Sequence, residues 1–128
     1  MKTCEESTSL VRQIRRENSA VVVELAGAID LHRSIPLRAC LLEVLAEQPP
    51  LTILNLAAVD FMDSSGLATL IEALQLSRRQ QILLRLVHLQ PRVRSIFEIS
   101  RLDKIFAIYE TEAAARELPP PGVTQLSD

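Results

Sequence analysis

The chain of 128 residues contains little of what many binding and catalytic motifs require. It has only three glycines, Gly27, Gly66 and Gly122, which excludes a glycine-rich phosphate-binding loop. Aromatic residues make up 3% of the sequence and tryptophan is absent, which argues against surfaces that stack on nucleic-acid bases. Generic nucleic-acid binders are usually basic, whereas this chain has a net charge of -2. We therefore expect no direct contact with nucleic acid.

Cysteine and histidine are also scarce. The two cysteines, Cys4 and Cys40, are too few for a disulfide scaffold, and we expect both to be reduced thiols. The two histidines, His32 and His88, lie far apart without a second ligand at metal-binding spacing, so we expect no metal site. The serines lack a histidine base near a comparable loop, and no Gly-x-Ser-x-Gly elbow is present. The sequence therefore predicts neither an enzyme nor a cofactor.

Long apolar segments are missing as well. No apolar run approaches the roughly 20 residues that span a bilayer, and the polar residues 1–16 lack the apolar centre of a signal peptide. The hydrophobic share of 48% and the charged share of 23% are ordinary for a soluble globular protein. We expect a cytoplasmic protein without membrane insertion. Its length fits one domain, which we place at residues 9–118 between tails at 1–8 and 119–128.

The sequence does contain an alternation of strand-like and helix-like segments. Apolar and β-branched runs predict strands at residues 9–16, 20–26, 51–56, 82–87 and 105–109. Helical spacing and punctuation predict helices from Asp30 or Ser34 to about 48, and at 66–79, 92–98 and 110–118. Strands and helices that alternate from residue 51 onward indicate mostly parallel pairing, after a first hairpin. The fold class is therefore α/β, with a mixed, mostly parallel sheet.

Two details of this scheme concern the segment between the second and third strands. We expect Gly27 to end the second strand, and we expect Pro36 in the first turn of the following helix, where proline is tolerated. Apolar residues recur along this helix at helical spacing, which predicts a wide buried stripe. Its members are Ile35, Leu37, Ala39, Leu41, Leu42, Val44 and Leu45.

The turn Asp63-Ser64-Ser65-Gly66 lies between a predicted buried strand and a predicted helix. Free N–H groups and the positive end of the helix dipole favour an anion at such a place. Taken alone, these residue types are more typical of a helix cap, with Gly66 allowing close packing. A phosphate on Ser64 or Ser65 would add about -1.5 to -2 charges beside Asp63. We therefore expect a phosphate at this turn to disrupt the binding of a docked partner and to leave the fold unchanged.

Three segments, taken in order, resemble the anti-sigma-factor antagonists of the STAS-domain family. They are Leu-Ala-Gly-Ala-Ile-Asp at 25–30, Phe-Met-Asp-Ser-Ser-Gly-Leu at 61–67, and the stretch from Pro91 to Leu102. The resemblance covers about residues 9–118 and implies a single STAS-type domain, with helices packed largely on one side of the sheet. Ala28, Arg101 and residues 78–81 depart from the family pattern, which bears on the identity of the partner.

The resemblance also implies a mechanism of partner switching. In the family, the unphosphorylated antagonist binds an anti-sigma factor that is also a serine kinase, and sigma factor is released. The kinase phosphorylates the first serine of the signature, and a serine phosphatase reverses the modification. By position, the phosphorylation site is Ser64, and the partner-binding residues are Asp30, Asp63, Ser64, Ser65 and Gly66. An alternative is a STAS docking subunit of a transporter or of a stressosome-like assembly. Self-association is left open.

Overall fold

The computed structural model describes residues 10–17 and 19–117, and the predicted tails lie outside them. The described chain forms one five-stranded sheet whose strands lie in the order in which they occur in the sequence. The strands are β1 (Val11–Glu17), β2 (Ala20–Ile29), β3 (Leu51–Met62), β4 (Leu83–Val87) and β5 (Ala107–Tyr109). The helical elements are α2 (Leu31–Ala46), α3 (Ser64–Arg79), α4 (Pro91–Ile99), the 3-10 turn η1 (Leu102–Lys104) and α5 (Glu112–Glu117).

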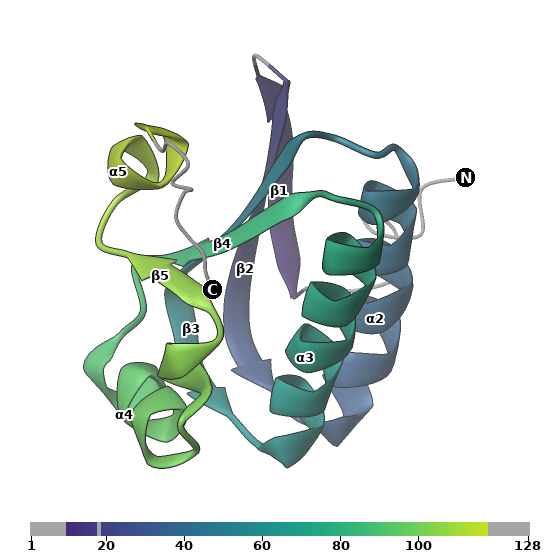
Figure 1. Cartoon of the computed structure of the whole chain (residues 1–128). Coiled ribbons are helices and arrows are strands. Elements are labelled where there is room, and N and C mark those ends of the chain that lie inside the picture. Colours follow the sequence, from purple (N-terminus) through teal and green to yellow (C-terminus); the bar gives the residue numbers. More distant parts are fainter. Residues whose placement is uncertain (1–9, 18, 118–128) are drawn as a thin grey trace.

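The pairing of the strands confirms the predicted mixed sheet. β1 and β2 form an antiparallel hairpin, whereas β2, β3, β4 and β5 pair in parallel. Helices α2 and α3 lie side by side against one face, and α5 lies over the other (Figure 1). None of the described helices is both long and apolar enough to cross a membrane. The described chain is therefore an α/β domain with its two long helices on the same side.

The prediction that Gly27 ends the second strand is wrong, because β2 continues to Ile29. Gly27 adopts a φ of +96°, and the register with β3 shifts between Gly27 and Ala28. A glycine in this left-handed region accommodates a bulge within a strand instead of terminating it. The third strand is also longer than the predicted 51–56, and it delivers Met62 directly to the turn before α3.

The helix after β2 differs from the prediction in three respects. It begins at Leu31, so Pro36 lies beyond its first turn. The predicted buried stripe is partly wrong, since Ile35 is 69% exposed while Leu37 and Leu41 face the core. Cys40 is buried and disulfide-bonded, so the expectation of a reduced thiol is wrong for this residue. The other cysteine, Cys4, lies outside the described residues.

The main core fills the space between the sheet and the helices α2, α3 and α4. Leu54 and Leu86 from the strands, Leu70 from α3 and Phe97 from α4 have no solvent-accessible surface. Phe97 meets Phe106 edge to face, with ring centres 5.5 Å apart. Because α2 and α3 are anchored along this core, the positions at which they begin are fixed relative to the strand ends.

A smaller cluster lies on the opposite face of the sheet, where Ala115 of α5 covers Val22, Ile53 and Val87. Ion pairs surround it. The guanidinium of Arg15 lies 2.9 Å from a Glu17 carboxylate oxygen, 3.1 Å from Glu24 and 2.7 Å from Glu112, and Arg116 lies 2.6 Å from Glu17. The pairs Arg15–Glu112 and Arg116–Glu17 tie the short helix α5 to β1, on the face of the sheet opposite α2 and α3.

Candidate functional site

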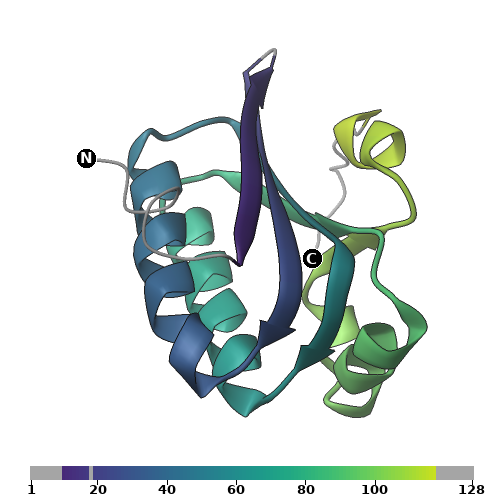
Figure 2. The same cartoon turned by 180° about the vertical axis from the view of Figure 1, so that it is seen from behind.

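The parallel strands β2 and β3 end at the same edge of the sheet and place two helix starts beside each other. Ile29, the last residue of β2, pairs with Met62, the last residue of β3, and each is followed by the cap of a helix. The backbone N–H of Asp63 donates to the carbonyl oxygen of Ile29 at 3.2 Å. Seen from behind, both strands run to the lower edge where α2 and α3 begin (Figure 2). The cap residues Asp30 and Asp63, distant in sequence, are thereby brought together.

Both aspartates act as helix caps. One carboxylate oxygen of Asp63 accepts hydrogen bonds from the backbone N–H groups of Ser65 at 2.9 Å and Gly66 at 3.1 Å. The carboxylate of Asp30 accepts one from the N–H of Arg33 at 3.0 Å. These bonds satisfy N–H groups that have no partner within the helix. The predicted capping role is confirmed for both residues, and the carboxylates are already engaged by their own helices.

The three residues after Asp63 differ in exposure. Ser64, the first residue of α3, is exposed, Ser65 is partly buried and Gly66 is buried. A Cβ atom on Gly66 would lie 2.7 Å from Met62 Cγ and 2.8 Å from both Ile29 Cγ2 and the Ile29 carbonyl oxygen. Gly66 therefore allows α3 to start in direct contact with the end of β2, and this contact leaves Ser64 at the surface. An exposed hydroxyl at a helix start is accessible to a modifying enzyme.

The surroundings of this turn include apolar side chains that the sequence analysis did not assign to the site. Leu31 and Ile35 at the start of α2 are 60% and 69% exposed, and Phe61 near the end of β3 is 42% exposed. Sequence reasoning placed Ile35 in the core stripe because its spacing fits. A narrower stripe through Leu37 and Leu41 would have left Ile35 outside. No group of acidic, histidine or cysteine side chains within the described residues is arranged to hold a metal ion.

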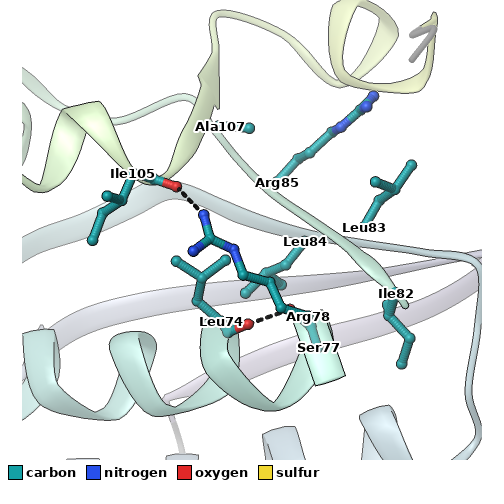
Figure 3. Close-up of a pocket in the computed structure, with 9 residues that line it drawn as sticks. All are labelled: Leu74, Ser77, Arg78, Ile82, Leu83, Leu84, Arg85, Ile105 and Ala107. Atoms are coloured by element: carbon teal, nitrogen blue, oxygen red, sulfur yellow. Dashed lines mark hydrogen bonds between the residues drawn. The ribbon is translucent and has the colours of Figure 1, made fainter. Parts of the chain in front are cut away.

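A separate hollow of about 190 Å³ lies between the end of α3, the start of β4 and the segment before β5 (Figure 3). Its walls are mainly aliphatic. Its three polar side chains each donate to a backbone carbonyl: Ser77 to Leu74, Arg78 to Ile105 and Arg85 to Ala115. Arg85 extends away from the hollow toward α5 (Figure 3). Nothing in this arrangement indicates a ligand, and the hollow lies at the opposite end of α3 from Ser64.

The sequence of the chain is similar to those of proteins in a known family. The model of the STAS domain matches residues 12–115. The anti-sigma F factor antagonist of Paenibacillus polymyxa is 28% identical over 104 residues, 80% of this chain and 89% of the relative. The anti-sigma-B factor antagonist of Bacillus subtilis is 30% identical over 95 residues, 74% of this chain and 86% of the relative.

Solved structures agree with the sequence matches. The anti-sigma factor antagonist SpoIIAA in its unphosphorylated form superposes with a TM-score of 0.69 at 26% identity, covering 80% of this chain and 90% of that one. An anti-sigma factor antagonist from Mycobacterium paratuberculosis superposes with a TM-score of 0.74 at 27% identity, covering 80% and 87%. The chain, whose paired helix starts carry the Asp-Ser-Ser-Gly turn, belongs to the STAS-domain family.

Proposed function

We propose that this protein is an anti-sigma-factor antagonist that works as a phosphorylation-controlled partner switch. When Ser64 is unphosphorylated, the protein binds an anti-sigma factor that is also a serine kinase. Phosphorylation of Ser64 releases that partner, and a serine phosphatase restores binding. The role is regulatory and involves no catalysis by this chain. The observation that carries the proposal is the exposed hydroxyl of Ser64 on the first residue of α3, directly after its cap Asp63.

Two solved structures of a similar protein, one phosphorylated and one not, support a phosphorylation switch in a protein with this fold. SpoIIAA is known in an unphosphorylated form and in a phosphorylated form, and this chain superposes on them with TM-scores of 0.69 and 0.63. Both forms therefore retain the fold that the present chain shares. A switch of this kind changes the surface that a partner meets and leaves the domain folded.

The capping geometry gives a physical reason for the direction of the switch. The N–H groups of Ser65 and Gly66, which would otherwise attract an anion, already donate to Asp63. A phosphate on Ser64 would therefore face the Asp63 carboxylate and gain little from the helix start. In a partner interface, a neutral hydroxyl is easily buried, whereas a phosphate brings about -1.5 to -2 charges and a desolvation cost. A difference of about 3 kcal/mol would change affinity roughly 150-fold.

The partner-binding residues in this proposal are Asp30, Asp63, Ser64, Ser65 and Gly66. Ser64 and Ser65 offer side chains at the surface of the turn, and the two aspartates contribute negative charge beside them. Gly66 is buried, so it contributes by setting the position of the turn. The partner is therefore expected to cover the neutral Ser64 hydroxyl without a basic group opposite it, because a basic group there would favour the phosphorylated form.

The test of the proposal is intact mass spectrometry after incubation with ATP and a purified anti-sigma factor with serine kinase activity from the source organism. We expect one added phosphate on the wild type and on Ser65→Ala, and none on Ser64→Ala. Equal phosphorylation of Ser64→Ala would refute the assignment of the site. A stable complex without phosphate on any variant would favour the docking-subunit alternative.

A second experiment measures affinity. Ser64→Asp places a carboxylate at the modified position, and we expect weaker binding of the same anti-sigma factor, with a change in unfolding free energy within about 0.5 kcal/mol because the position is exposed. Ser95→Asp, at an exposed position on α4, is the matched control and should bind normally. Equal affinity of Ser64→Asp and wild type would contradict the electrostatic account.

A further inference from the structure

Helix α2 begins with two exposed aliphatic side chains. Leu31 is 60% exposed and Ile35 is 69% exposed, and they are two of six large apolar side chains exposed within the described residues. Residues four positions apart on a helix are neighbours on its surface, so Leu31 and Ile35 form one continuous apolar area. Grouped exposed apolar side chains of this kind are typical of interaction sites.

An ion pair between the two long helices shows where this area lies relative to Ser64. Arg38 of α2 contacts Glu72 of α3 at 2.7 Å. Leu31 precedes Arg38 by about two helical turns, so the two residues lie on the same side of α2. Ser65 precedes Glu72 by about two turns, so these two residues lie on the same side of α3. Because α2 and α3 start level, at paired strand ends, Leu31 lies across from Ser65.

The exposed residues of α3 complete the surface. Ser64 and Ala68 lie one turn apart and are both exposed. Leu31 and Ile35 therefore continue the surface of Ser64 and Ala68 across the junction of the two helices, and the Arg38–Glu72 pair borders it further along. These four residues, Leu31, Ile35, Ser64 and Ala68, are called the docking surface below.

We propose that the docking surface binds apolar side chains of the same anti-sigma factor that senses the phosphorylation state of Ser64. This inference rests on the proposed function. A stable protein interface buries about 800 Å² on each partner, which is far more than one helix turn provides. We therefore expect a partner that covers Ser64 to extend over the adjoining Leu31 and Ile35, which are exposed apolar side chains.

The proposal assigns different roles to the two helices. Leu31 and Ile35 supply apolar contact that is independent of phosphorylation, and their burial contributes to affinity and to the choice of partner. Ser64 is the residue whose charge changes on phosphorylation. The partner therefore presents an apolar patch opposite α2 and a neutral region opposite the Ser64 hydroxyl.

The experiment measures the dissociation constant of unphosphorylated protein and the purified anti-sigma factor kinase of the source organism by titration calorimetry. Leu31→Ser and Ile35→Ser are compared with the wild type, singly and together. We expect each single variant to bind about 10-fold more weakly and the double variant about 100-fold more weakly. Ile99→Ser is the matched control, since Ile99 is 83% exposed on the last turn of α4, and its affinity should stay within about 2-fold.

The Ser64→Asp variant, measured in the same titrations, separates failure of this inference from failure of the proposed function. Wild-type affinity in the double variant, together with weakened binding of Ser64→Asp, would overturn the inference and leave the switch intact. Absence of binding by the wild type would overturn both. Analytical ultracentrifugation adds one further outcome. A dimer of the wild type that the double variant loses would show that the surface joins two copies of this chain, which also overturns the proposal.

Discussion

Replacement of Gly66 by alanine tests the close contact that positions Ser64. The added Cβ would lie 2.7 Å from Met62 Cγ, 2.8 Å from Ile29 Cγ2 and 2.8 Å from the Ile29 carbonyl oxygen. Side chains can adjust, but this backbone oxygen belongs to β2 and accepts the N–H of Asp63. Relief of the contact therefore requires α3 to move away from the sheet. Overpacking of this kind costs about 1–3 kcal/mol.

Helix propensity acts in the opposite direction. Alanine is favoured over glycine in a helix by at most about 1 kcal/mol. The two effects predict a net loss of up to about 2 kcal/mol in the free energy of unfolding. Urea denaturation measures this change, and the thermal midpoint should fall by about 4 °C for each kcal/mol of lost stability.

The control for this prediction is Ala68→Gly, at an exposed position on the same helix. It should cost about 1 kcal/mol through propensity alone. A Gly66→Ala protein that is more stable than the wild type would show that propensity dominates at this position and would refute the argument from close packing. Gly66→Ala is also expected to weaken binding of the anti-sigma factor, because it displaces the start of α3, which carries Ser64.

Three other predictions concern local stability. Asp63→Ala should lower the unfolding free energy by about 0.5–2 kcal/mol in urea titrations, whereas Asp63→Asn keeps a capping oxygen and should cost less. Thr52→Val should raise it by about 1 kcal/mol, because the buried Thr52 hydroxyl has no hydrogen-bond partner within the described residues; a loss of stability would contradict this account. Burial disfavours the charged form of Glu112, but hydrogen bonds from Arg15 and Asn55 outweigh it and hold its pKa below the usual 4.5. Its stabilising contribution is therefore present above that pH and lost as the pH falls through the lowered pKa. Fluorescence of Tyr109, the single tyrosine, should report this acid transition, and Glu112→Gln should reduce it.

The turn before α3 was predictable because its physics is local. An aspartate followed by two serines and a glycine satisfies the first N–H groups of a helix through contacts within three residues. The same reasoning identified Asp30 as one of two possible caps of α2. That Ser64 is exposed while Gly66 is buried also follows from the need for the smallest residue where helix and strand touch.

The errors arose where the outcome depends on residues distant in sequence. Ile35 fits the helical spacing of the core stripe, yet which side of α2 faces the sheet is decided by packing against β2 and α3, and that packing favours Leu37 and Leu41. Gly27 was expected to break a strand, but pairing with β3 continues the strand through a bulge.

The order of strands and helices, the mostly parallel pairing and the capped turn follow from the sequence alone, because hydrophobic periodicity and capping depend on near neighbours. The folded structure was needed to show that the caps Asp30 and Asp63 follow paired strand ends, that Leu31 and Ile35 are exposed at the start of α2, and that α5 is held over the second face. These arrangements depend on strand register and on contacts between distant segments, which local patterns do not specify.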